Sequence, residues 1–171
     1  MILTRKIAAL VLWLIAGAGA QAQEFRMQTE SDSLSWLVLE TDSTSDRWRL
    51  PHPVYQFQTG DVDGNGSTDA LVGVVKKTRF HRDFGRRLFI FKNYRGRVRP
   101  LWMGSKLGGE LVDFRVISDE GSQKAIVRAL ETGKNGLYSV TDYEWEEFGL
   151  AFKRTILKDT NQETAKKQFS P

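Results

Sequence analysis

The sequence predicts an all-β fold of antiparallel, blade-like sheet repeats, with about two and a half propeller-like units in one compact domain. Short apolar or alternating runs dominate the chain and are rich in β-branched and aromatic residues. Clusters of Gly, Asn, Asp and Ser separate these runs, and no stretch before the last residues has the apolar period of a helix. Evenly spaced short strands with turn signals between them are typical of antiparallel sheets.

The expected strands follow one another along the chain from residue 34 to residue 157. They cover residues 34–40, 47–50, 54–58, 70–76, 87–93, 97–103, 111–117, 124–130, 137–145 and 149–157. Turn clusters between them lie at residues 42–46, 94–96, 108–109, 119–122 and 133–136. Each run either alternates between polar and apolar side chains, as a half-buried strand does, or is continuously apolar, as a fully buried strand is.

Two stretches of the chain align with each other, which suggests an internal repeat. Residues 54–105 and 111–157 each begin with an aromatic strand, pass through a polar loop and close with an aromatic hairpin. The period of about 50 to 57 residues suits a four-stranded sheet per repeat. Residues 33–51 resemble the closing hairpin alone. The alternative is chance similarity within an antiparallel meander. We expect a stand-alone domain, and the alternative is a propeller fragment that closes by oligomerisation.

Residues 1–22 are interpreted as a secretory signal peptide. Arg5 and Lys6 precede an apolar run at 7–18, and Ala20-Gln21-Ala22 forms a small-x-small cleavage site before Gln23. The alternative, a membrane anchor, is disfavoured because a spanning helix needs about 20 apolar residues. We therefore expect an exported protein, periplasmic or extracellular, that does not span a membrane. The chain contains no Cys, so its core alone, or its core plus a metal, has to hold it together.

The expected layout after the signal peptide is a blade-repeat domain at residues 23–157 and a polar tail at 158–171. The tail has no apolar periodicity, so we expect it to be loose or to form a short frayed helix at 162–168.

The stretch "DVDGNGSTD" is the strongest candidate site. Side-chain oxygens fall at positions 1, 3, 5 and 9 of the loop, Gly66 at position 6 and a main-chain carbonyl at position 7. Ca²⁺ prefers six to eight oxygen ligands, and a tight loop with alternating inward side chains supplies them. The predicted ligands are Asp61, Asp63, Asn65, Ser67 and Asp69. The alternative is an Asx-rich turn that holds no metal.

Position 12 of this loop is Val72 rather than Glu, so the loop is not an EF-hand and leads into a strand. The stretch "DVDGNGSTDALVGV" resembles the calcium-binding core of FG-GAP/VCBS-type repeats, the blade repeats of integrin α-chain propellers and of many bacterial exported proteins. The resemblance implies a structural Ca²⁺ in a loop between two blade strands. The corresponding second loop, residues 118–124, lacks the spacing and is expected to bind no metal.

Residues 76–99 form a basic segment with ten Lys and Arg residues and one acid, Asp83. An exposed hairpin of this charge attracts an anionic partner, such as an acidic glycan or envelope polymer, or an acidic protein face. Export makes nucleic acid an unexpected partner. The alternative is a solvated strand face whose Arg stems cover apolar surface. The predicted contact residues are Arg79, His81, Arg82, Arg86 and Arg87.

No motif of a nucleophilic or phosphate-binding enzyme is present, so we expect a non-catalytic binding or structural domain. The runner-up is a glycan-acting hydrolase or an accessory subunit of one, because paired carboxylates carry out glycoside hydrolysis. The carboxylates considered for that role are Glu110 with Asp113, and Glu144 with Glu146 and Glu147.

Overall fold

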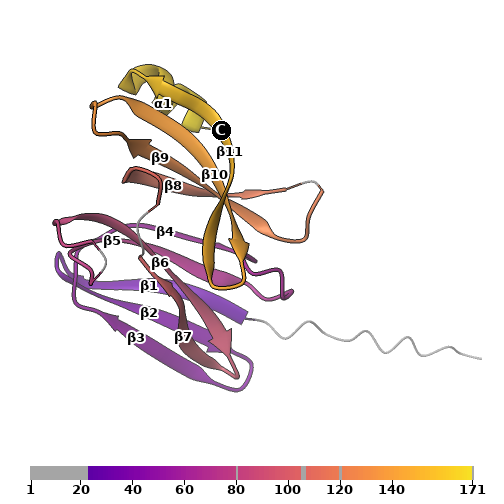
Figure 1. Ribbon diagram of the computed structural model, residues 1–171. Coiled ribbons are helices and arrows are strands. Elements are labelled where there is room, and N and C mark those ends of the chain that lie inside the picture. The colour runs from indigo at the N-terminus through magenta and orange to yellow at the C-terminus, as the bar shows by residue number, and fades with distance from the viewer. Residues whose placement is uncertain (1–22, 80, 105–106, 120, 171) are drawn as a thin grey trace, which may run out of the picture.

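The computed structural model describes residues 23–79, 81–104, 107–119 and 121–170. These residues form three antiparallel sheets stacked face to face, with one short helix on the outer face of the last sheet (Figure 1). The prediction of an all-β fold of blade-like sheets is confirmed. The predicted signal peptide, residues 1–22, lies outside the described residues.

The first sheet is a three-stranded meander with one apolar face. Its strands are β1 (Gln23–Ser31), β2 (Leu34–Thr41) and β3 (Ser45–Leu50). Leu37 and Leu39 alternate along β2 and are fully buried, whereas Trp36, one position before Leu37, faces outward. On that outer face the Arg47 guanidinium lies 4.5 Å from the Trp36 ring centroid, and Trp36 Nε1 donates to Glu30 Oε2 at 2.8 Å. Polar contacts therefore cover this end of the stack.

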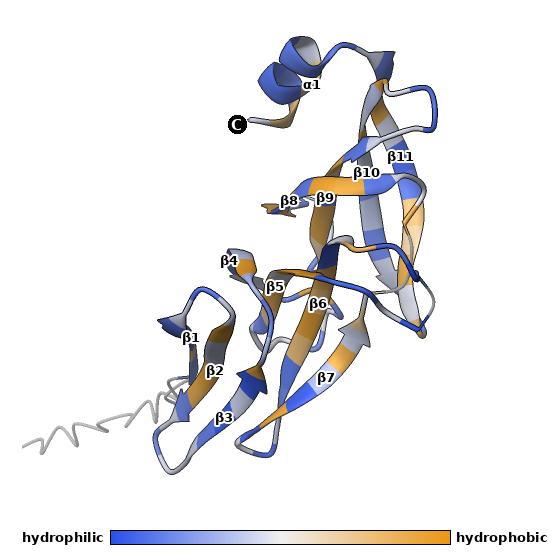
Figure 2. Ribbon diagram, turned by 90° about the vertical axis from the view of Figure 1, so that its left-hand side faces the viewer, coloured by the Kyte–Doolittle hydropathy of each residue, from blue (hydrophilic) through white to orange (hydrophobic). Residues whose placement is uncertain are grey.

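The second sheet is the middle layer. Its strands, in spatial order, are β4 (Val54–Gly60), β5 (Asp69–Lys76), β6 (Gly85–Tyr94) and β7 (Arg97–Met103). Both faces of β5 and β6 are buried, so these strands read as continuous apolar runs rather than alternating ones. Figure 2 shows the hydrophobic residues concentrated on the inner strands. Val72, Phe89 and Phe91 face the first sheet, whereas Leu71 and Ile90 face the third.

The third sheet repeats the meander of the second. Its strands, in chain order, are β8 (Glu110–Ser118), β9 (Ala125–Thr132), β10 (Tyr138–Glu146) and β11 (Gly149–Thr160). Phe114, Val127 and Trp145 pack against the second sheet in one apolar cluster. The two stretches that align in the sequence thus form two four-stranded sheets of the same strand order, as a repeat of blade-like units predicts.

The helix α1 (Gln162–Phe169) covers part of the outer face of the third sheet. Asn161 caps its first turn by accepting a hydrogen bond from the Thr164 amide at 2.9 Å. Ala165 and Phe169 are buried and pack against Leu130 and Val140. The tail expected to be loose is therefore a packed helix over these residues, close to the alternative helix at 162–168. Two apolar side chains four positions apart are enough to dock one helix face.

Sequence patterning missed β1. Only Phe25 and Met27 in this strand are apolar, so the run lacks the density of the other strands. No helix within the described part of the chain is long and apolar enough to cross a membrane.

Candidate metal centre

The acidic loop closes the β4–β5 hairpin at one end of the middle sheet. Gly60 and Asp69 are cross-strand partners, and residues 61–68 form the connection between them. Val62 is fully buried in the cluster between the second and third sheets and anchors the loop to the core. Gly64 and Gly66 have φ values of 74° and 81°, the left-handed region that glycine adopts most readily. The bends required by the loop therefore fall on residues that tolerate them.

Asp61 organises the start of the loop through main-chain amides. Its Oδ1 accepts from Gly64 N at 2.8 Å and from Asn65 N at 3.1 Å, and its Oδ2 accepts from Gly66 N at 2.8 Å. Asp63 Oδ1 accepts from Asn65 N at 3.2 Å, and Asn65 Oδ1 accepts from Ser67 N at 2.7 Å. These bonds occur in Asx-rich turns with or without a metal, so they do not separate the two interpretations of the loop.

Asp69 is the residue of the loop that favours a bound cation. Its side chain is fully buried, and Oδ2 accepts from Val62 N at 3.0 Å and from Asp63 N at 3.4 Å. Its other oxygen, Oδ1, is buried and has no hydrogen-bond partner among the described residues. A buried, unpaired carboxylate oxygen is costly unless a cation or a donor satisfies it.

The three carboxylates converge. Asp61, Asp63 and Asp69 each offer one oxygen, and these oxygens all lie within 4.8 Å of one another. Burial, and then the charges of Asp63 and Asp61, raise the pKa of Asp69 to about 7 against the opposing effect of its amide hydrogen bonds. Hard oxygen ligands at this spacing fit Ca²⁺, which binds carboxylates at about 2.3–2.6 Å. The other two predicted ligands, Asn65 and Ser67, lie in the same loop.

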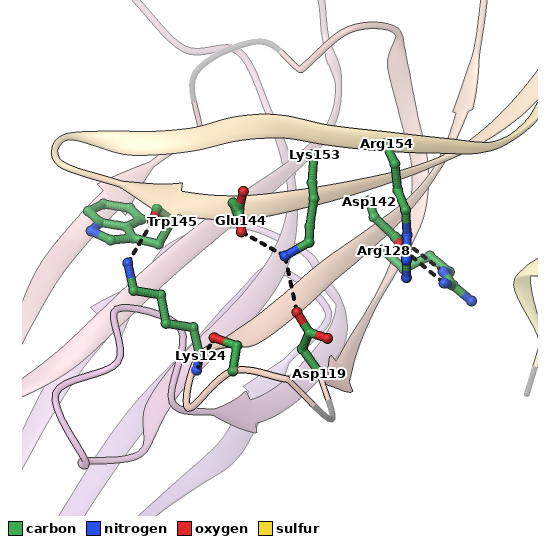
Figure 3. A network of polar contacts seen from close by, with 9 residues as sticks. Asp119, Lys124, Arg128, Asp142, Glu144, Trp145, Lys153 and Arg154 are labelled. Atoms are coloured by element: carbon green, nitrogen blue, oxygen red, sulfur yellow. Dashed lines mark hydrogen bonds and ion pairs between the residues drawn. The ribbon is translucent and has the colours of Figure 1, made fainter.

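The loop is packed against the third sheet. Ala125 N donates to the main-chain oxygen of Asp61 at 2.7 Å, and the aliphatic stem of Lys124 leaves no room for a side chain at Gly64. Lys124 Nζ donates to the Trp145 carbonyl at 3.2 Å (Figure 3). None of the Lys or Arg residues in the described chain forms an ion pair with the three carboxylates.

The predicted contact residues of the basic segment divide into two groups. Arg87 is 4% exposed and donates to the carbonyls of Arg86 and Asp83 at 2.7 and 2.6 Å. His81 is 8% exposed, with Nε2 3.1 Å from Glu110 Oε1. These two side chains therefore belong to the interior of the fold. The other three, Arg79, Arg82 and Arg86, are exposed.

The outer face of the third sheet carries a charge network that sequence patterning did not find. Asp142 is fully buried and accepts from Arg128 Nε at 2.7 Å, from Arg128 Nη2 at 3.0 Å and from Arg154 Nε at 2.9 Å (Figure 3). Lys153 Nζ bridges Asp119 Oδ2 at 3.0 Å and Glu144 Oε2 at 2.8 Å. One carboxylate considered for hydrolysis, Glu144, is thus held in an ion pair. Its candidate partners, Glu146 and Glu147, are exposed.

A second buried carboxylate, Glu131, was also missed. It is 3% exposed, and the Tyr143 hydroxyl lies 3.1 and 3.0 Å from its two oxygens. Gly109 N donates to Glu131 Oε1 at 2.8 Å, and Gly108 N donates to the Tyr143 hydroxyl at 2.9 Å. Burial, and then the charge of Glu131, raise the pKa of Tyr143. The signal in the sequence that could have revealed this site is a single acid, Glu131, directly after the apolar residues Ala129 and Leu130 of β9.

Comparison with known proteins identifies no family model that matches this chain, and no curated protein resembles it significantly.

Proposed function

We propose that the protein is an exported, non-catalytic binding or structural domain stabilised by one Ca²⁺ in the loop from Asp61 to Asp69. The observation that carries the proposal is the unpartnered, buried Oδ1 of Asp69 within 4.8 Å of oxygens from two further carboxylates. The resemblance of the loop to FG-GAP/VCBS-type calcium repeats supports the same reading. No described observation favours the hydrolase alternative over it.

The role of the ion follows from the position of the loop. Asp69 is the first residue of β5, one of the two inner strands of the middle sheet, and Val62 lies in the core between two sheets. An ion that bridges Asp61, Asp63 and Asp69 would therefore join both ends of the hairpin loop to the core. Because the ion binds the folded chain, free Ca²⁺ at about one hundred times the dissociation constant would add about 2.7 kcal/mol of stability.

Isothermal titration calorimetry of the purified protein with CaCl₂ tests the site. We expect one ion per chain in the wild type, and at least about tenfold weaker binding in Asp61→Asn, because ligand charge sets the affinity of such loops. Asp42→Asn is the matched control, since Asp42 is an exposed acid in the β2–β3 turn. Absence of calcium binding in the wild type, or equal weakening in both variants, would contradict the proposal.

Export requires its own experiment. When the full chain is expressed in a bacterium with a secretion pathway, we expect the protein outside the cytoplasm, with Gln23 or Gln21 as the first residue by amino-terminal sequencing. An unprocessed cytoplasmic chain beginning at Met1 would argue against export and leave the calcium site untouched.

A further inference from the structure

The β6–β7 hairpin presents a row of cations that the predicted contact set did not include. Lys92 on β6 lies directly across from Arg99 on β7, and Tyr94 lies across from Arg97. Residues two apart on a strand point to the same face, so these four side chains share one face of the hairpin. Arg97 and Arg99 are exposed, Lys92 is partly exposed, and Arg95 is exposed at the turn with a φ of 55°.

Within the described chain these cations have no acidic partner. No ion pair involves Lys92, Arg95, Arg97 or Arg99 among the described residues. Arg99 Nη1 donates only to the Val98 carbonyl at 3.1 Å, and the Arg95 guanidinium lies 5.3 Å from the Tyr94 ring centroid. Like charges directly across two strands destabilise a sheet. The arrangement thus has a cost that an external anion would remove.

Protection of an exposed sheet edge is the usual structural reason for charges on an edge strand. On β7 this protection is provided in other ways. Val98 N donates to Asp46 Oδ2 of the neighbouring β3 at 2.9 Å, and Pro100 has no N–H to offer. β3 and β7 lie side by side at this edge (Figure 1), and Arg47 and Arg49 of β3 are exposed on the opposite face, away from the middle sheet.

We propose that the face formed by Lys92, Tyr94, Arg97 and Arg99, here called the hairpin basic face, binds an acidic polysaccharide whose charges are uronate carboxylates. Successive cations on one strand lie about 7 Å apart, so that one chain of spaced carboxylates can meet several of them. Arginine binds carboxylates through two parallel hydrogen bonds, and the half-exposed Tyr94 ring offers an apolar surface to a sugar ring.

The choice of a polysaccharide over nucleic acid rests on the exported location in the proposed function. Calcium binding by the acidic loop is a separate property, which calorimetry with CaCl₂ reads out without any polymer. A failure of one is therefore distinguishable from a failure of the other.

The test is fluorescence anisotropy of labelled hyaluronate oligosaccharide, used as the uronate probe, with the purified protein at low and at physiological salt. In Lys92→Gln/Arg97→Gln/Arg99→Gln we expect about tenfold or greater loss of affinity and a weaker salt dependence. Each exposed pair of a protein cation and a uronate carboxylate contributes modestly, so all three cations are replaced together. The control Lys158→Gln/Lys166→Gln/Lys167→Gln removes the same charge from exposed positions at the carboxyl end of the chain. We expect it to bind within about twofold of the wild type.

Several outcomes would overturn the proposal. Undetectable hyaluronate binding at low salt refutes the uronate ligand, and equal weakening by the control triple variant refutes the hairpin basic face as its location. Equal binding of neutral dextran refutes recognition through charge. Tighter binding of single-stranded DNA of matched charge assigns the face to nucleic acid instead.

Unchanged melting temperatures in both triple variants would establish that differences in affinity do not arise from unfolding.

Discussion

Asp63→Asn separates the metal site from an ordinary acidic turn, because calcium should stabilise the wild type more than the variant only if the loop binds the ion. The amide keeps the oxygen that accepts from Asn65 N and removes one charge from the three carboxylates. Unit charges within 4.8 Å repel by about 1 kcal/mol in bulk water and by about 3 kcal/mol at the effective dielectric of a protein surface. In EDTA at pH 8 we therefore expect the variant to be about 1–3 kcal/mol more stable than the wild type.

In saturating Ca²⁺ the stability advantage of the variant over the wild type should shrink. The wild type gains about 2.7 kcal/mol when free calcium is about one hundred times its dissociation constant. A variant that binds about tenfold more weakly gains about 1.4 kcal/mol less, so its advantage over the wild type falls by that amount. For a domain of this size each kcal/mol shifts the melting temperature by roughly 2–4 °C, which scanning calorimetry in EDTA and in millimolar CaCl₂ resolves.

The reasoning is refuted if Asp63→Asn is less stable than the wild type in EDTA, or if calcium raises both melting temperatures equally. Asp42→Asn, a neutralised acid outside the cluster, controls for the change in net charge and should behave as the wild type in both buffers.

Three further predictions concern the rest of the fold. Arg128→Gln should lower the free energy of unfolding in urea by about 3 kcal/mol, because the fully buried Asp142 loses a partner that donates two hydrogen bonds. Arg154→Gln should lower it by about 1 kcal/mol or less, because the Arg154 side chain is 55% exposed. Equal losses in the two variants would contradict this prediction. Phe169→Ala should lower the free energy of unfolding by about 3–5 kcal/mol, because it leaves a cavity between α1 and the third sheet. Phe148→Ala is the control, and it should have little effect because the Phe148 ring is 89% exposed. Burial, and then the charge of Lys76, lower the pKa of His52 below 6.5. The folded state is therefore harder to protonate at His52 than the unfolded state, and stability should fall as the pH drops below that value. NMR titration of His52 should show the lowered pKa, and Lys76→Gln should raise it part of the way back.

Strand positions could be predicted because alternation and turn residues are local signals. Strand β1 was not predicted because its inward face contains only two apolar residues, Phe25 and Met27. These residues become part of the core only when the middle sheet covers them. Arg87 illustrates the reverse error. Its place in a basic run suggested exposure, but its register opposite Val74 puts it in the interior of the sheet. Residue spacing alone predicted a metal site in the acidic loop. The burial of Asp69 depends on how the third sheet packs over β5, which no local pattern encodes.

The acidic loop and the turn of the β6–β7 hairpin are joined by a chain of hydrogen bonds through the side chains of Gln23 and Asn93. Gln23 Nε2 donates to Thr68 O at 2.6 Å, Asn93 Nδ2 donates to Gln23 Oε1 at 2.9 Å, and Gly96 N donates to Asn93 Oδ1 at 2.7 Å. An ion that orders the loop should therefore also steady the hairpin turn, and any effect of the ion on binding at the hairpin basic face must be reciprocal.

We accordingly expect Ca²⁺ to tighten hyaluronate binding in the wild type and to have a smaller effect in Asn93→Ala, which leaves every carboxylate and every cation of the two sites in place. Anisotropy titrations in EDTA and in calcium measure both ratios. A wild-type ratio of one would mean that the two sites act independently despite the hydrogen bonds that connect them.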